Sequence, residues 1–153
     1  MDIKLVILLA LLLLNLLYRR LEKFYLESLE IKDLDIPATV FVKHILSLIE
    51  TDLPCIKPYN VDLKYYNTKS VLGRYYFYSN TLVIYLCKSS KLIEVTDTVI
   101  HEYCHHLQNH LKRNEIKKAL ELYNEAYENH PWEVQARNLA EIKRLTILKK
   151  LTS

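Results

Sequence analysis

Two histidines and a glutamate lie within five residues: His101, Glu102 and His105 form the pattern H-E-x-x-H. If this stretch is helical, His101 and His105 are one turn apart on the same face, so both imidazoles can point at one metal ion. Neutral imidazole nitrogen suits zinc, and a catalytic zinc site has three protein ligands and an open position for water. Glu102 directly follows the first histidine, which places its carboxylate beside that position as a general base. The spacing therefore predicts two zinc ligands and a base.

The residues around the motif are typical of a helix. Thr96 and Asp97 are favoured N-cap residues and predict the start of a helix of about fifteen residues. Cys104 falls on the same side as the two histidines, where it is either a fourth, thiolate ligand or a small buried residue that lets another element pack closely. The alternative for the whole motif is two partly buried histidines and a surface glutamate. Apolar residues at helical spacing support the helix: Val99, Ile100, Tyr103, Cys104, Leu107 and Leu111.

A third ligand is expected from the stretch that begins at His130-Pro131. Proline is favoured at the first position of a helix, and it biases the residue before it toward the extended conformation of an N-cap. Glu133 then lies in the first turn, with Ala136 and Ala140 forming a small-residue face that permits close approach to the motif helix. We expect Glu133 to be the third ligand; the alternative is that it only caps its own helix. Other possible ligands are His130, His106 and His110.

Through residues 101–108 and 131–137 the chain resembles the gluzincin metallopeptidases, specifically the small minimal zincins related to the ImmA/IrrE and SprT-like groups of bacteria and phages. The resemblance extends upstream to Gly73-Arg74-Tyr75, with a hairpin before the motif helix. In all it covers roughly residues 58–140. No cysteine-rich zinc ribbon follows the last helix, which disfavours the DNA-associated function of the SprT-like group.

The resemblance implies a role for each motif residue. His101 and His105 are the histidine ligands of Zn²⁺, Glu133 is the third ligand and Glu102 is the catalytic base. The resemblance also implies that residues 81–87 form an edge strand, which receives an extended peptide substrate by strand addition; the alternative is a core strand of the sheet. The expected function is a zinc-dependent metallopeptidase acting on a peptide or protein. The alternative is a non-catalytic structural or interaction protein that keeps the zinc-binding scaffold.

A peptidase also needs a donor that stabilises the negative oxygen of the transition state. Four side chains are candidates, and the sequence does not decide among them: Tyr123, Tyr127, His110 and His130.

Composition indicates one globular domain. The 153 residues are 50% hydrophobic and 25% charged, and a single glycine with four prolines favours long regular elements. The net charge is +3 and no Lys/Arg run exceeds two residues, so no nucleic-acid partner is expected. The three cysteines have no paired spacing, which is typical of a reducing compartment.

The N-terminal segment, residues 3–17, is almost continuously apolar and is followed by Arg19-Arg20. As a helix it would be about 22 Å long, against about 30 Å for the hydrocarbon core of a bilayer. It is a membrane anchor, a buried core helix or a signal segment, in that order of preference. We therefore divide the chain into a hydrophobic helix at residues 1–20 and a zincin-like domain at residues 21–153. An anchor would place the domain on the cytoplasmic side of the membrane, because the basic residues follow the segment; the alternative is a soluble cytoplasmic protein.

The other elements predict an α+β fold that is mainly helical. A charged helix is expected at residues 21–34, another between Pro37 and Pro54, and further helices at residues 116–127 and from Pro131 to the C-terminus. Residues 61–66, 74–78 and 81–87 are rich in β-branched and aromatic side chains. These three segments predict a small three-stranded antiparallel sheet.

Overall fold

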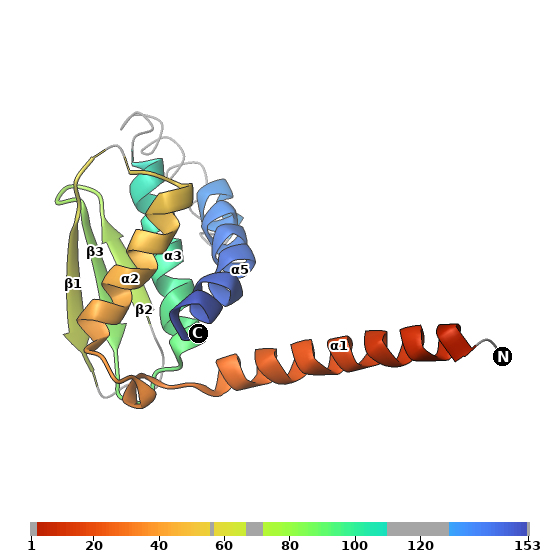
Figure 1. The fold of residues 1–153 in the computed structure, drawn as a ribbon. Coiled ribbons are helices and arrows are strands. Elements are labelled where there is room, and N and C mark those ends of the chain that lie inside the picture. Colours follow the sequence, from red (N-terminus) through yellow and green to blue (C-terminus); the bar gives the residue numbers. More distant parts are fainter. Residues whose placement is uncertain (1–2, 56, 67–71, 110–128, 153) are drawn as a thin grey trace.

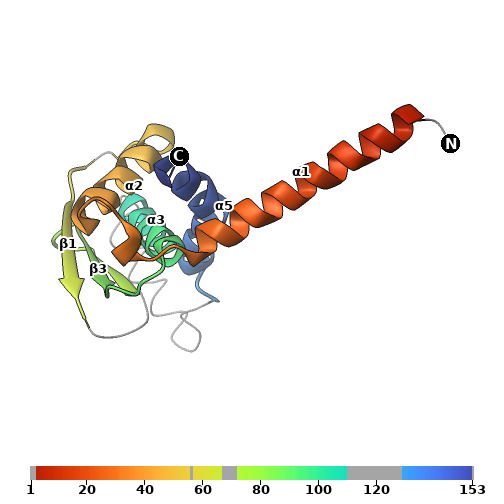
Figure 2. The same cartoon turned by 60° about the horizontal axis from the view of Figure 1, so that its bottom comes forward.

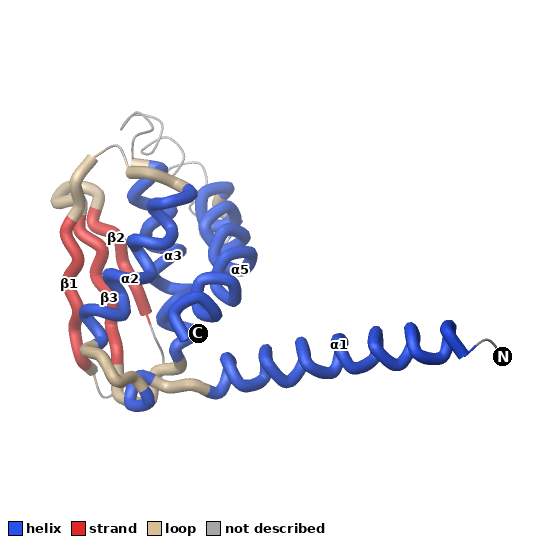
Figure 3. Tube along the Cα trace, viewed as in Figure 1, coloured by secondary structure: helices blue, strands red, loops and turns tan. Residues whose placement is uncertain are grey.

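The computed structural model describes residues 3–55, 57–66, 72–109 and 129–152. The fold class is α+β, as the sequence predicts, with long helices and one small sheet (Figures 1 and 3). The expected helix at residues 116–127 lies outside the described residues. The elements in chain order are α1 (Ile3–Ser28), η1 (Ile31–Asp33), α2 (Ala38–Asp52), β1 (Asn60–Tyr65), β2 (Leu72–Tyr76), β3 (Thr81–Leu86), α3 (Leu92–Gln108) and α5 (Pro131–Thr152).

The sheet is mixed, so the prediction of an antiparallel sheet was wrong in this detail. Its strand order is β1-β3-β2: β1 runs parallel to β3, with Asn60 beside Thr81, and β2 runs antiparallel to β3. A tight turn containing Asn80, whose φ is +47°, joins β2 to β3 and reverses the chain there. Because β1 pairs with the other side of β3, the expected edge strand at residues 81–87 is central, and β2 is an edge strand.

Helix α3 is the central element of the domain. In Figures 1 and 2 it lies between the sheet and α5, and it contacts α2 as well. Three apolar residues of α3, Val99, Ile100 and Tyr103, are fully buried in the core. Because α3 is packed on several sides, the directions of its buried side chains are fixed. The largest buried partners from the other elements are Phe41, Ile45, Ile49, Leu82, Ile84, Leu86 and Leu148.

Helix α3 begins one turn earlier than the sequence predicts. Lys91 is its N-cap, and Thr96 is a buried interior residue whose Oγ1 donates to the carbonyl of Leu92 at 2.8 Å. Burial of Leu92 and Val95 explains the extension, since apolar contacts hold the first turn in the helix without a side-chain cap. The prediction that Thr96 or Asp97 caps the helix was therefore wrong, but the motif does lie inside it.

The hydrophobic N-terminal segment and the charged segment after it form one helix. Helix α1 runs without a break to Ser28, so the charged helix expected at residues 21–34 is the end of α1 followed by η1. Figures 1 and 2 show α1 projecting away from the rest of the chain. Leu26 near its end is buried in the core, whereas every residue from Ile7 to Leu21 is exposed. No helix in the described part of the chain is long and apolar enough to cross a membrane.

Candidate metal centre

The two motif histidines meet on one face of α3, as the helical spacing predicts. Their Nε2 atoms are 3.1 Å apart, and the two rings meet edge to face with centroids 4.7 Å apart. His105 is buried and His101 is partly exposed. One turn of helix has thus directed two imidazole nitrogens toward the same point.

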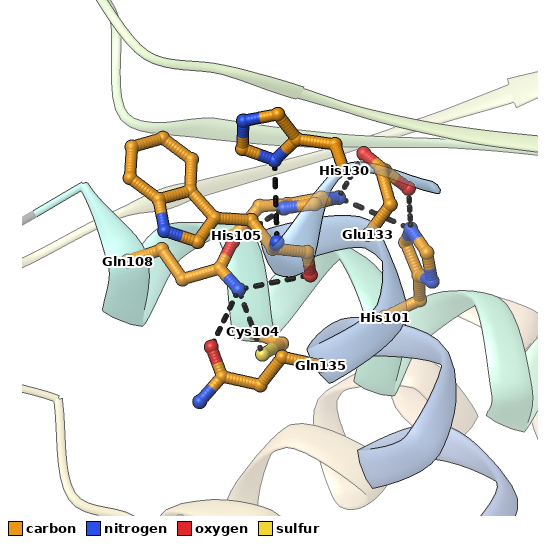
Figure 4. A network of polar contacts seen from close by, with 8 residues as sticks. His101, Cys104, His105, Gln108, His130, Glu133 and Gln135 are labelled. Carbon is orange, nitrogen blue, oxygen red and sulfur yellow. Dashed lines mark hydrogen bonds and ion pairs between the residues drawn. The ribbon is translucent and has the colours of Figure 1, made fainter. Parts of the chain in front are cut away.

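Glu133 completes this group from the first turn of α5. Its Oε2 lies 3.1 Å from Nε2 of His101, and its Oε1 lies 3.1 Å from Nε2 of His105 (Figure 4). Helix α5 packs along α3 through the small side chains of Ala136 and Ala140, which are 0% and 1% exposed. Bulkier residues there would hold the helices apart and carry Glu133 away from the histidines. The small-residue face therefore brings the third side chain to the other two.

The three side chains fit a zinc ion. One ligand atom from each of His101, His105 and Glu133 lies within 4.8 Å of the others. Ligands at about 2.0–2.1 Å from a tetrahedral zinc are about 3.3 Å from one another, close to the observed 3.1 Å between the two Nε2 atoms. Glu133 is only 8% exposed, and a buried carboxylate needs positive charge beside it. Two imidazoles and a carboxylate are a frequent ligand set for catalytic zinc.

Gln108 fixes the orientation of His105. Its Oε1 is 2.7 Å from Nδ1 of His105, so it accepts a hydrogen bond from the Nδ1–H and leaves the lone pair of Nε2 facing Glu133. Its Nε2 donates to the carbonyl of Trp132 at 3.1 Å and to Oε1 of Gln135 at 3.0 Å (Figure 4). One amide therefore orients His105 on α3 and joins α3 to the turn that carries Glu133.

The charges in the centre shift the pKa of His105. Burial opposes its charged form, but hydrogen bonds to Glu133 and Gln108 outweigh that cost and raise its pKa. An imidazolium that is stabilised in this way competes with a metal, because a histidine ligand must give up its proton.

Glu102 lies beside the centre and is 7% exposed. Burial is the main cause of a raised pKa of its carboxyl, while the positive charges of His105 and His101 act in the opposite direction. A hydrogen bond from the backbone N–H of Tyr75 on β2 also favours the ionised form. A carboxyl whose pKa lies above its ordinary value is better matched to proton transfer near neutral pH.

A cleft of about 370 Å³ opens over these residues. Its walls come from β2 and from the two helices that carry the possible ligands. It combines the charged centre with aromatic surface, as substrate-binding clefts commonly do. Its lining residues are Gly73, Arg74, Tyr75, Phe77, His101, Glu102, His105, His130, Trp132 and Glu133.

The competing ligands occupy other positions. His130 lines the cleft, but its Nδ1 accepts a hydrogen bond from the backbone N–H of Trp132 at 3.2 Å, an N-cap contact at the start of α5. His106 is buried, and its ring nitrogens lie 3.1 Å from the hydroxyl of Tyr75 and 3.1 Å from the carbonyl of Lys57.

One further candidate ligand, Cys104, and one of the expected oxyanion donors, His130, can also be placed. The thiol of Cys104 is buried and its Sγ is 3.6 Å from Nε2 of Gln108; it does not belong to the three-residue group. Burial raises the pKa of this thiol to about 11, which makes thiolate ligation unfavourable. Of the four possible oxyanion donors only His130 is described, and it lines the cleft. His110, Tyr123 and Tyr127 lie outside the described residues.

The sequence did not predict the roles of Gln108 and Gly73. Gln108 is three residues after His105, so a helix brings their side chains together, and an amide at that spacing could have been read as a partner of the ligand. Gly73 is the only glycine in the chain, and a Cβ at this position of β2 would meet the side chain of Glu102. A lone glycine in a strand indicates a close approach of another group.

No protein-family model matches the chain, and no curated protein or solved structure matches it significantly. The resemblance to the minimal zincins therefore remains a prediction from the two sequence motifs. The geometry of the centre is the basis for assigning a function.

Proposed function

We propose that this protein is a zinc-dependent metallopeptidase whose zinc is held by His101, His105 and Glu133. The observation that carries the proposal is the convergence of these three side chains beside Glu102 at the base of a cleft. A structural zinc site normally has four protein ligands and no open position, whereas a catalytic site has three and an adjacent base. The three-residue group and the buried Glu102 suit the second arrangement.

Each residue has a chemical role in this proposal. A zinc ion bound here would polarise the scissile carbonyl and lower the pKa of the attacking water. Glu102 accepts the proton from that water and passes it to the leaving amine. Gln108 keeps His105 in the tautomer that leaves Nε2 free to bind metal. His130, which lines the cleft, is the described candidate for the donor to the negative oxygen.

We infer that the substrate is an extended peptide bound along β2. Gly73, Arg74 and Tyr75 of this edge strand line the cleft, and β3 is already paired on both sides. An extended peptide can add to the unpaired edge of a sheet through main-chain hydrogen bonds. This assignment moves the expected peptide-binding strand from residues 81–87 to β2.

The second candidate is a non-catalytic protein in which the same residues hold a structural zinc. The position of the three possible ligands at the contact between α3 and α5, with His105 and Glu133 buried, is compatible with this role, since a metal there would join the two helices. Such a protein has no use for Glu102. A change at Glu102 should therefore remove the activity of a peptidase but leave a structural zinc site unaffected.

Glu102→Gln in the full chain tests the proposal. This variant keeps the shape of the side chain and leaves the three ligands in place, so its zinc content should equal that of the wild type. Hydrolysis should fall by about 10²–10⁴-fold, which is the usual contribution of a positioned acid or base. Zinc is measured by elemental analysis, and cleavage by mass spectrometry of a peptide library incubated with each protein.

Glu133→Ala is the matched ligand variant. It should lose both stoichiometric zinc and activity, whereas Glu102→Gln should lose activity alone. Full activity in Glu102→Gln would overturn the proposed mechanism. Zinc retained in Glu133→Ala would remove Glu133 from the ligand set. If zinc binds stoichiometrically but no library member is cleaved by the wild type, the structural alternative is favoured.

A further inference from the structure

Helix α1 exposes more apolar surface than any other element in the described part of the chain. The run Leu11–Leu14 illustrates this, because its four leucines are 60%, 54%, 65% and 61% exposed. Contiguous exposed apolar surface on this scale is uncommon in soluble domains and indicates a binding surface. The other large exposed apolar residues of this segment are Leu5, Ile7, Leu8, Leu9, Leu16 and Leu17.

The distribution of these side chains around the helix identifies the kind of partner. Consecutive residues of a helix are 100° apart, so the four leucines of Leu11–Leu14 point in four directions around the axis. A second helix or a protein groove covers one face, and it would leave leucines on the opposite face in water. Lipid hydrocarbon is the apolar partner that can surround the helix on all sides.

The residues that follow the apolar segment suit the surface of a bilayer. Tyr18 is 64% exposed, and Arg19 and Arg20 beside it are exposed as well. Tyrosine is enriched at the level of lipid headgroups, and arginine binds their phosphates while its stem stays in apolar surroundings. Along the chain the apolar residues are followed by a tyrosine and then by two arginines. This order matches the hydrocarbon core, the interface and the phosphate headgroups of a bilayer.

The base of α1 is attached to the domain. Leu26 is buried in the core, and Glu22 forms an ion pair of 2.7 Å with Lys149 near the end of α5. The exposed part of the helix therefore leaves the domain in a fixed direction, with Tyr18, Arg19 and Arg20 about two turns before the buried Leu26. A helix held in this way can enter lipid while the metal centre stays outside it.

We propose that α1 attaches this protein to a lipid bilayer by inserting its apolar segment, with Arg19 and Arg20 at the headgroups. This inference does not depend on the proposed peptidase activity, since it uses residues remote from the metal centre. It adds a lipid surface as a partner.

The test is flotation of the full-length protein with vesicles. Protein purified in mild detergent is diluted into vesicles of phosphatidylcholine alone, or of phosphatidylcholine with 30 mol% phosphatidylglycerol, and is then centrifuged through a density gradient. The wild type should float with both kinds of vesicle and resist extraction by high salt. Arg19→Gln with Arg20→Gln should lose only the added affinity for the anionic vesicles.

Leu12→Asp is the decisive variant. A carboxylate near the middle of an apolar helix should lower partitioning into lipid by about a hundredfold. The matched control is Ile142→Asp on α5, since Ile142 is 72% exposed and tests whether any exposed apolar residue has the same effect. Circular dichroism and zinc content, expected to be equal in both variants and the wild type, separate a binding defect from misfolding.

Three outcomes would overturn the proposal. The first is wild-type protein that stays at the bottom of the gradient with both kinds of vesicle. The second is equal flotation of Leu12→Asp and the wild type. The third is a dimer that forms through α1, is detected by cross-linking and light scattering, and does not float; it would make a second copy the partner instead.

Discussion

The backbone of Gly73 lies directly against the side chain of Glu102. A Cβ at position 73 would be 2.6 Å from Cγ and 2.7 Å from Oε1 of Glu102, closer than such atoms normally approach. The φ angle of Gly73 is not positive, so its backbone conformation is open to other residues and the restriction is steric. The only glycine in the chain therefore leaves space for the proposed catalytic base.

Gly73→Ala should displace Glu102 and lower hydrolysis by about 10–10²-fold, because a small misplacement of a catalytic group is costly. Zinc content should not change, since the atoms nearest to the added Cβ belong to Glu102 and Thr98 and not to the three possible ligands. Peptide cleavage and elemental analysis measure the two effects. Leu72→Ala on the same strand is the control, because Leu72 is 59% exposed and should tolerate the change.

The same added Cβ would lie 2.6 Å from Cγ2 of Thr98, so a second variant separates the two clashes. Thr98→Ser removes that methyl group. Combined with Gly73→Ala it should recover stability but little activity, because the clash with Glu102 remains. Full recovery of activity in the double variant would show that Glu102 is not the group displaced.

Gln108→Leu should weaken zinc binding by about 10–100-fold, the usual effect of removing the partner that orients a histidine ligand. The side chains are similar in size, but leucine cannot accept from Nδ1 of His105 or donate to the carbonyl of Trp132. Gln108→Glu keeps the acceptor and should bind zinc more tightly than Gln108→Leu. Competition with a chromophoric chelator gives both affinities; equal affinity in Gln108→Leu and the wild type would exclude this role.

The zinc-free protein should lose stability as the pH rises above about 6.5. The pKa of His105 is raised from its ordinary value of 6.5, so the stabilisation from its charged form is fully present below 6.5 and is lost as the pH passes the folded-state pKa. The raised pKa of Glu102 acts in the same direction, from its ordinary value of 4.5 upward. Urea unfolding in the presence of a chelator, at several values between pH 6 and 8, measures this slope.

Zinc should reverse that dependence. Histidine binds zinc only after losing its proton, so the stabilisation by added zinc should grow over the same pH interval. His105→Ala should flatten both curves, because the contribution of the histidine to each of them is gone. A zinc-free protein that becomes more stable from pH 6 to 8 would contradict the prediction.

The cysteines should differ in reactivity. Burial raises the pKa of Cys104 to about 11, whereas hydrogen bonds from Ser89 and Ser90 lower the pKa of the partly exposed Cys87 thiol. At pH 7.5 iodoacetamide should modify Cys87 at least about a hundredfold faster than Cys104, since the thiolate is the reactive form. Mass spectrometry of timed digests measures both rates. In urea the two should become similar; similar rates in the native protein would contradict the buried thiol.

The sequence by itself determined the local part of the centre. His101 and His105 are four residues apart, and the helix required to align them is specified by the apolar periodicity around them. Pro131 sets the start of the helix that carries Glu133, and Ala136 and Ala140 give that helix its small-residue face. These features depend on neighbours a few residues away, which is why the three residues of the candidate metal centre could be named in advance.

Only the tertiary structure decided the long-range relationships. Strand residues could be recognised by their types, but backbone hydrogen bonds do not depend on side-chain identity, so the parallel pairing of β1 with β3 and the edge position of β2 were not predictable. The same holds for Gly73, whose importance comes from Glu102, a residue on a different element. The apolar residues of α1 were visible in the sequence, but their exposure follows from where the other helices pack, and only the assembled core shows that the apolar segment of α1 is left outside it.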